Sequence, residues 1–273
     1  MQADTSLGRA LAALRALDAL PARQKLRKLR DPRAQLLATL MFILTVLSFG
    51  RHDVAALLPL ALFPTVLAAL GQVSAGLVWR TVLLATPFAL AVGLLNPWFE
   101  TAPMLTLGGF TLSAGWVSLA AIVLRVALTV SATLVLVATT GVPALCNALA
   151  RLGVPRVLTV QLLLLYRYLF VLAGEASRMD TARRLRSGRG SSMPLKVYAS
   201  LLGQLLLRSV DRSQRLHQAM LARGFKGDLH AAPSTHWQSA DSLFVAGWAA
   251  FFIAMRWLDG PGRLGRLLLG AWT

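Results

Sequence analysis

Two stretches in the C-terminal half of the chain combine arginine and glycine in a pattern that suits recognition of a carboxylate. They read TARRLRSGRG (181–190) and QAMLARGFKG (218–227). A glycine just past a helix end takes the left-handed conformation at little cost and leaves the preceding arginine beside the negative end of the helix dipole. A guanidinium there can pair with a carboxylate of another protein. One such end is most simply ordinary capping, but two of them favour two equivalent partner sites.

The second stretch ends a helix that has two distinct faces. On a helical wheel, one arc of roughly 80° holds Arg208, Arg212, Arg215 and Arg223, and the opposite side holds Leu206, Val210, Met220 and Leu221. Phe225 follows the cap, so this end offers a guanidinium for a carboxylate and a ring for a pocket. We therefore predict two tips that insert into grooves of partner proteins. Their residues are Arg186, Ser187 and Gly188 in the first tip, and Ala222, Arg223, Gly224 and Phe225 in the second.

The residues that other chemistries need do not occur in the required patterns. No lysine follows a glycine, so there is no P-loop for ATP, and there is no His-Glu-x-x-His pair for zinc. The single cysteine, Cys146, excludes a disulfide framework and a cysteine-rich metal site. No Ser, His and Asp set stands out. The sequence therefore predicts a non-catalytic chain with no metal site and no cofactor of its own.

The composition is that of a membrane protein. Of 273 residues, 56% are hydrophobic and 14% are charged, whereas soluble domains carry about a quarter charged residues. The net charge of +17 could suit nucleic acid, but the basic segments alternate with long apolar runs, as cytoplasmic loops do. We therefore expect contact with membrane lipid and no nucleic-acid partner. The N-terminus lacks the pattern of a cleavable signal.

Five apolar segments are predicted to span the membrane: 34–49, 54–70 with a kink at Pro64, 78–95, 116–140 and 242–258. Residues 96–115 predict a loop with a hairpin, flanked by the interfacial Trp98 and Trp116. The positive-inside rule places the N-terminus and residues 141–240 in the cytoplasm. The fifth span then leaves the C-terminus outside, which its three arginines (Arg256, Arg263 and Arg266) fit poorly.

Residues 157–174 are apolar enough for another span, but we predict that they do not cross. Arg167 lies among them, and the helical pattern continues without a breaker over 155–186, about 48 Å and too long for one span. The block 141–240 also holds fourteen Lys/Arg against four acidic residues. An amphipathic helix packed beneath the membrane domain fits this segment better.

The predicted fold is an all-α polytopic membrane protein with about five transmembrane helices and long cytoplasmic amphipathic helices. Its parts are a basic cytoplasmic N-terminal segment (1–33), a membrane domain with four spans (34–140), a cytoplasmic module (141–240), and a last span with a short tail (241–273). The N-terminal segment either lies on the membrane surface or is a solvated lead-in.

Three stretches resemble the transmembrane coupling subunit (T component, EcfT/CbiQ type) of energy-coupling factor (ECF) transporters. They are LRDPRAQLL (29–37), YRYLFVLAGEASRMDTARRLRSG (166–188) and LLLRSVDRSQRLHQAMLARGF (205–225). The second tip matches the family's Ala-Arg-Gly signature in full. The first has Leu185-Arg186-Ser187, with leucine where alanine is usual, so Arg183 and Arg184 with Leu185 remain an alternative register. The chain is most similar to the cobalt/nickel CbiQ branch.

The resemblance implies a coupling subunit of an ABC-type importer in the plasma (inner) membrane. Two cytoplasmic ABC-type ATPases would bind ATP and Mg²⁺, and each would receive one arginine tip. A separate substrate-binding membrane subunit (S subunit) would carry the substrate. The resemblance to the CbiQ branch favours cobalt or nickel, and the sequence of this chain leaves a vitamin as an alternative. The residues 141–240 would be the coupling-helix module.

A self-contained secondary transporter or channel is the main alternative. It needs polar groups inside the membrane, and Arg125 in the fourth span is the main candidate. A membrane enzyme acting on an anionic lipid head group is a further alternative, but no base–nucleophile set supports it.

Overall fold

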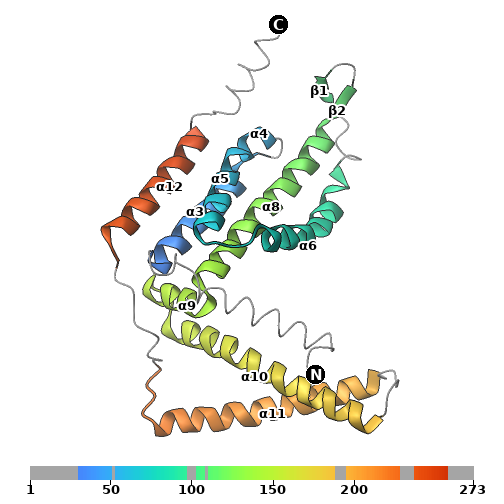
Figure 1. The fold of residues 1–273 in the computed structure, drawn as a ribbon, viewed down its shortest axis with the longest axis vertical. Helices are drawn as coiled ribbons and strands as arrows, with labels where there is room; N and C mark the ends of the chain where they lie inside the picture. Colours follow the sequence, from blue (N-terminus) through green and yellow to red (C-terminus); the bar gives the residue numbers. More distant parts are fainter. Residues whose placement is uncertain are drawn as a thin grey trace. The chain divides into compact units, whose positions relative to one another are not determined.

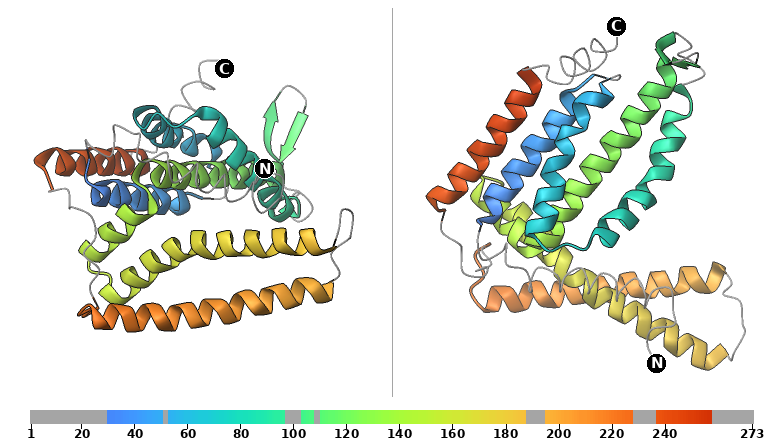
Figure 2. Two further views of the ribbon diagram at one scale, coloured as in Figure 1. Left: turned by 60° about the horizontal axis from the view of Figure 1, so that its bottom comes forward. Right: turned by 45° about the horizontal axis from the view of Figure 1, so that its top comes forward.

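The computed structural model describes residues 30–50, 53–96, 103–107, 110–187, 195–227 and 237–257. The chain forms two compact units, which Figures 1 and 2 show. We call Leu20–Gly141 with Thr235–Thr273 the bundle unit, and Met1–Ala19 with Val142–Ser234 the basic unit. Most of the predicted N-terminal segment, residues 1–29, lies outside the described residues.

The bundle unit is built from the apolar segments that the sequence predicts as spans. Its main helices are α3 (Pro32–Ser48), α4 (Val54–Leu57), α5 (Leu62–Leu70), α6 (Ala75–Gly93), α8 (Ala114–Thr140) and α12 (Ser239–Trp257). Of these, α6 and α8 are long and apolar enough to cross a membrane, while Pro32–Ser48 and Val54–Leu70 are shorter apolar helices. The all-α polytopic membrane fold is therefore confirmed.

The second predicted span is interrupted one turn before the proline that we expected to kink it. A 3₁₀ turn, η1 (Pro59–Ala61), separates α4 from α5, and Pro64 lies in the first turn of α5. Proline has no N–H to donate to the carbonyl four residues earlier, here that of Leu60, and its ring clashes with that carbonyl. The interruption therefore lies where the proline disturbs the helix rather than at the proline itself.

The predicted hairpin is present between the third and fourth spans. Strand β1 (Pro103–Leu107) pairs antiparallel with β2 (Phe110–Ser113), with Leu107 opposite Phe110. Strand β2 leads directly into α8. Trp116 is exposed in the first turn of α8, whereas Trp98 lies outside the described residues.

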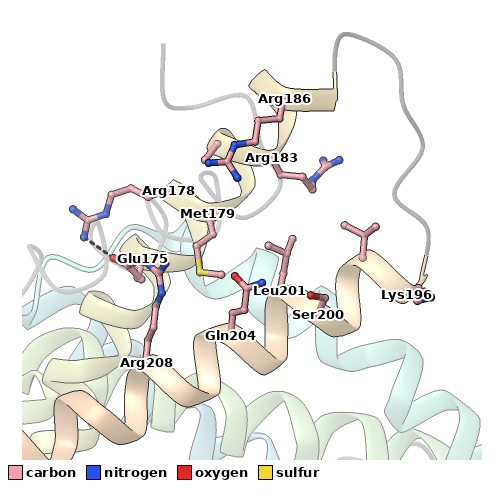
Figure 3. A pocket seen from close by; sticks show the side chains of 12 residues that line it. Glu175, Arg178, Met179, Arg183, Arg186, Lys196, Ser200, Leu201, Gln204 and Arg208 are labelled. Carbon is pink, nitrogen blue, oxygen red and sulfur yellow. Dashed lines mark hydrogen bonds and ion pairs between the residues drawn. The ribbon is translucent and has the colours of Figure 1, made fainter.

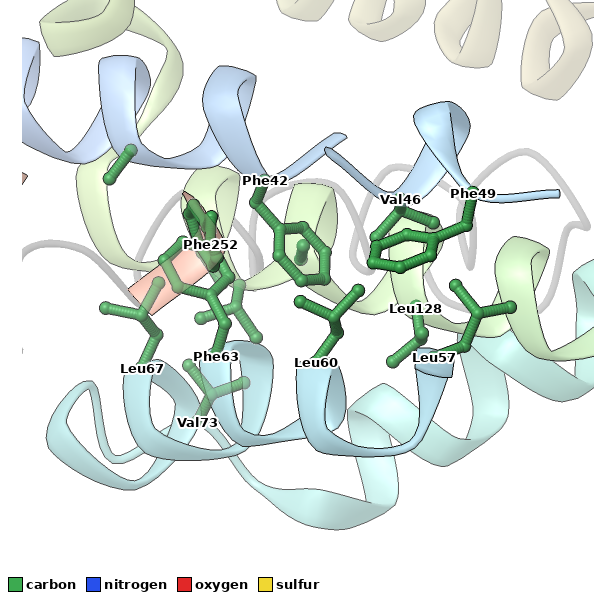
Figure 4. Close-up of a cluster of buried hydrophobic side chains, with 14 residues drawn as sticks. Phe42, Val46, Phe49, Leu57, Leu60, Phe63, Leu67, Val73, Leu128 and Phe252 are labelled. Atoms are coloured by element: carbon green, nitrogen blue, oxygen red, sulfur yellow. The ribbon is translucent and has the colours of Figure 1, made fainter. Parts of the chain in front are cut away.

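An aromatic cluster joins the first helices of the bundle to its last one (Figure 4). The rings of Phe42 and Phe63 stack with centroids 4.7 Å apart, and Trp248 packs edge-on against Phe63 at 4.8 Å. Phe252 also contacts Phe63, at 5.4 Å. Such pairs contribute about 0.5–1.5 kcal/mol each beyond the area they bury. The cluster therefore holds α12 against helices almost 200 residues earlier in the chain.

Helices α3 and α12 begin side by side and run parallel (Figure 1). The backbone N–H of Asp31 donates to Asp241 Oδ1 at 3.1 Å, and that of Gln238 donates to Asp241 Oδ2 at 3.1 Å. At the other end, the Arg256 guanidinium lies 5.3 Å from the Phe49 ring centroid. We call the contact of Asp31, Gln238 and Asp241 the carboxylate clasp. One buried carboxylate thus satisfies N–H groups at the start of two helices, where such groups have no partner within the helix.

The long helix α8 lies antiparallel to α3. Its side chains form hydrogen bonds with polar groups near both ends of α3. Near the start of α3, Thr140 Oγ1 donates to Gln35 Oε1 at 2.8 Å. Near its end, Arg125 Nη2 donates to the carbonyls of Phe49 and Gly50, at 3.2 and 3.0 Å. Arg125, the main candidate for an intramembrane transport residue, therefore caps a helix C-terminus.

The basic unit consists, in its described part, of α9 (Val142–Arg151), α10 (Arg156–Ser187) and α11 (Leu195–Ala222). Helix α10 is unbroken over 32 residues, so its length is about 48 Å. By length and composition alone, Arg156–Arg186 qualifies as a membrane span; that it does not cross remains a prediction. Cys146 in α9 is buried, and burial raises the pKa of its thiol. The thiol is therefore protonated and shielded.

Candidate functional site

The two predicted tips belong to α10 and α11, which lie side by side and run in opposite directions (Figures 1 and 2). Arg208 Nη1 of α11 pairs with Glu175 Oε1 of α10 at 2.5 Å. Toward the end of α10, Arg186 lines the same groove as Val197, near the start of α11. The two helices therefore end in opposite directions, with one arginine tip at each end of the pair.

The second tip is closed by a complete Schellman motif. The N–H of Phe225 donates to the carbonyl of Met220 at 3.0 Å, and the N–H of Gly224 donates to that of Leu221 at 2.9 Å. Gly224 has φ +77°, the left-handed conformation that this motif requires of the residue just past the helix. The predicted glycine cap is therefore confirmed at Gly224. Ala222 is the last helical residue and Arg223 the next one.

The exposed side chains of α11 follow the two faces expected from the sequence. Arg212, Arg215 and Arg223 are exposed, and Arg208 pairs with Glu175. On the opposite side, Leu206 and Leu221 are 64% and 54% exposed. Met220 and Phe225, which the Schellman motif joins through their backbones, are each partly buried. The helix thus presents a basic face and an apolar face, and neither is buried within the basic unit.

At the first tip, the arginines differ in what they contact. Asp180 binds both Arg183, at 3.2 Å, and Arg184, at 2.9 Å. Arg186 is exposed and forms no ion pair or hydrogen bond with the described part of the chain. Leu185 is 82% exposed beside it. Helix α10 extends to Ser187, and Gly188 lies outside the described residues. The guanidinium of Arg186 is therefore available to a partner, whereas Arg183 and Arg184, the alternative register, are bound to Asp180.

The antiparallel arrangement separates the two tips widely. Arg223 lies 26 residues after Val197, which lines the groove at the Arg186 end. At 1.5 Å per residue, this corresponds to about 39 Å along the axis of α11. One small partner surface cannot contact both guanidinium groups across this distance.

Two acidic residues of α10, Glu175 and Asp180, hold these arginines in place, and neither was predicted as a site residue. Asp180 lies three and four residues before Arg183 and Arg184, the spacing at which helix side chains meet. This signal could have been found in the sequence. The pairing of Glu175 with Arg208 of α11 could not have been found in the sequence, because it depends on the register of the two helices. Among the described residues, no group of three or more His, Cys, Asp or Glu side chains could hold a metal ion.

Comparison with known proteins connects this arrangement to a protein family. Residues 23–236 match the family CbiQ, described as cobalt transport protein. The chain is 36% identical over 111 residues to the cobalt transport protein CbiQ of Rhodobacter capsulatus, covering 40% of this chain and 46% of the relative. It is 33% identical over 160 residues to that of Salmonella typhimurium, covering 54% and 71%. An uncharacterized protein of Methanocaldococcus jannaschii is 29% identical over 131 residues, covering 47% and 49%. The match thus spans less than half the length of the first relative.

Proposed function

Because the chain belongs to the CbiQ family of cobalt transport proteins, we propose that it is the non-catalytic coupling subunit of an ECF-type importer for cobalt or nickel. Two cytoplasmic ABC-type ATPases would each bind one arginine tip, and ATP and Mg²⁺ would be held by the ATPases. A separate S subunit would bind the metal ion. The observation that carries this proposal is the placement of Arg186 and Arg223 at opposite ends of the antiparallel pair α10 and α11.

The exposure of the tips supports a role in partner recognition. A charge-assisted pair between guanidinium and carboxylate contributes about 1.5–3 kcal/mol. Arg223 is exposed, and its backbone is held by the Schellman motif, so its guanidinium extends from a defined helix end. Arg186 is exposed, while Asp180 binds the two neighbouring arginines. Each tip can therefore offer one cation to an acidic groove of a partner.

Loss of both tips tests the proposal. We expect Arg186→Ala with Arg223→Ala to abolish co-purification of both ATPases, while the chain still inserts into the membrane. Either single variant should only weaken assembly, because one tip remains. The matched control is Arg212→Ala with Arg215→Ala, which removes two exposed charges from α11 away from its tip. Retention of both ATPases by the double tip variant would refute the proposed role of the tips.

We propose that the N-terminus of α3 faces the cytoplasm, which the charge of the preceding residues supports. Since α12 runs parallel to α3, its C-terminal end would then face outward. Engineered cysteines test this orientation, because the native Cys146 is buried. In spheroplasts, an impermeant maleimide should label Ala55→Cys but reach Ser74→Cys only after permeabilisation. The reverse labelling would put the start of α3 and the end of α8, which leads into the basic unit, outside the cell, and would contradict binding of the tips to cytoplasmic ATPases.

The alternative, a self-contained transporter or channel, rests on Arg125 in α8. The contacts of Arg125 with the carbonyls of Phe49 and Gly50 account for that charge as a helix cap. Cobalt uptake by vesicles that contain this chain alone, without ATP, would favour the alternative. We expect no uptake unless the ATPases and the S subunit are present.

A further inference from the structure

A basic groove lies between the end of α10 and the start of α11 (Figure 3). Its cavity volume is about 860 Å³. The cationic residues that line it are Arg178, Arg183, Arg186, Lys196 and Arg208, and among the described residues that line it Glu175 is the only acidic one. We call this feature the hairpin groove. It is distinct from the second tip at Arg223.

The charges of the hairpin groove are not balanced by their neighbours. Glu175 is shared by Arg178, at 3.4 Å, and Arg208, at 2.5 Å. Arg186 and Lys196 form no ion pair with the described part of the chain. Lys196 lies in the first turn of α11, where the positive end of the helix dipole adds to its charge. The groove therefore has cationic groups available for an anionic ligand.

The same groove also has an apolar surface. Met179 of α10 and Leu201 of α11 extend into it (Figure 3), and Ala182 and Val197 also line it. Leu185 and Leu195 are 82% and 83% exposed, and each precedes a groove cation, Arg186 or Lys196, in the sequence. Inorganic phosphate would contact only the cations and leave this apolar surface uncovered. An amphiphile with an anionic head and a hydrocarbon body matches both surfaces.

The size of the groove suits a small amphiphile. The groove offers about 860 Å³, within the range of about 300–1,000 Å³ that is typical of small-molecule sites. The head group, glycerol and first acyl carbons of a phospholipid are of this size.

We propose that the hairpin groove binds one anionic phospholipid. Its phosphodiester pairs with Lys196, the other groove cations, Arg178 among them, add attraction at longer range, and its glycerol and first acyl carbons lie against Met179 and Leu201. The remaining acyl carbons leave the groove beside Leu185 and Leu195. This proposal does not depend on the coupling function, and Arg186 is left unchanged in its test so that the two can be distinguished.

Native mass spectrometry of the full chain in detergent can measure this binding. The probes are dioctanoyl phosphatidylglycerol, its zwitterionic phosphatidylcholine counterpart and inorganic phosphate. We expect wild type to prefer phosphatidylglycerol, and Arg178→Gln with Lys196→Gln to lower its affinity about tenfold. The matched control, Arg212→Gln with Arg215→Gln, removes the same charge from α11 and should change the affinity less than about twofold.

Two further variants separate a lipid site from an anion site. Met179→Gln with Leu201→Gln should weaken phosphatidylglycerol binding and leave phosphate binding unchanged. Lys196→Gln alone, which breaks no ion pair of the described residues, should give about a threefold loss. Circular dichroism checks that each variant keeps its helicity. If the double variant Arg178→Gln with Lys196→Gln loses helicity, the single variant Lys196→Gln tests the proposal instead.

Three outcomes would overturn the proposal. Wild-type affinity in the Arg178→Gln, Lys196→Gln variant would show that lipid binds elsewhere. Equal losses in this variant and its control would show attraction to overall charge. Full displacement of phosphatidylglycerol by equimolar phosphate, or tighter binding of a glutamate-rich peptide that depends on Lys196, would assign the groove to a different ligand.

Discussion

The bundle unit and the basic unit hold helices of similar length in different ways. In the bundle, Phe42, Leu60 and Phe63 are fully buried, and α8 packs against four other helical segments. In the basic unit, no residue of α11 is buried. Instead, the ion pair of Glu175 and Arg208 joins it to α10, and the Schellman motif fixes its end. The bundle is thus stabilised by its own packing, while α11 of the basic unit keeps its side chains accessible.

This difference predicts where substitutions affect stability and where they affect binding. Packing of buried side chains contributes several kcal/mol per residue, whereas exposed ion pairs contribute about 0–1 kcal/mol. The bundle should therefore be sensitive to the loss of single side chains. In the basic unit, the loss of a single side chain should change the stability little. It should instead change the spacing of the helices or the binding of partners.

The largest effect is expected from Phe63→Ala in the bundle. Phe63 contacts Phe42, Trp248 and Phe252, so its removal leaves a cavity at the centre of the aromatic cluster. We expect a loss of about 3–5 kcal/mol, measured as a lower midpoint of thermal aggregation in detergent. The control, Leu207→Ala in α11, removes a side chain that is 68% exposed and should cost less than about 0.5 kcal/mol. Equal shifts in the two variants would contradict the contrast between the units.

A smaller but still large effect is expected from Asp241→Ala in the carboxylate clasp. The substitution leaves the N–H groups of Asp31 and Gln238 without their acceptors. Two N–H groups that lose their acceptors should together cost about 2–4 kcal/mol. The midpoint of thermal aggregation measures this loss, and Asp241→Asn, which keeps one acceptor oxygen, should lose less. Wild-type stability of both variants would show that water replaces the clasp.

Gly224→Ala should have a local effect at the second tip. Gly224 has φ +77°, and an alanine there costs about 1–2 kcal/mol. We expect faster hydrogen exchange at the amide of Phe225, whose bond to Met220 closes the tip. Gly203→Ala is the matched control, because Gly203 lies inside α11 with no atom within 4 Å of an added Cβ. It should slow exchange within α11 instead, and faster exchange in both variants would exclude backbone conformation as the cause.

The smallest change in stability is expected from Glu175→Gln. The pairs with Arg178 and Arg208 lie near the surface, so their loss should cost less than about 1 kcal/mol. The spacing of α10 and α11 should nevertheless become broader, since this pair connects the two helices. Spin labels at Leu185→Cys and Leu195→Cys measure that distance distribution. Asp211→Asn, an exposed acid of α11, is the control, and an unchanged distribution in Glu175→Gln would show that other contacts set the spacing.

Local features of the fold were predictable because they depend on nearby residues. Apolar length predicted the helices of the bundle to within about three residues, and turn residues predicted the hairpin before α8. The cap at Gly224 was predictable because glycine adopts the left-handed conformation most readily. The position of the break before Pro64 was wrong by one turn, since proline disturbs the helix four residues earlier.

The sequence by itself therefore determined the class of the protein, its long helices and the arginine that ends α11. Only the tertiary structure decided which distant groups meet. Asp31 and Asp241 are 210 residues apart, and Arg125 is 75 residues from Gly50. Composition and spacing carry no information on such pairs, because each carboxylate or guanidinium has several polar groups of similar strength available to it. The packing of the helices decides which of these groups come within hydrogen-bonding distance.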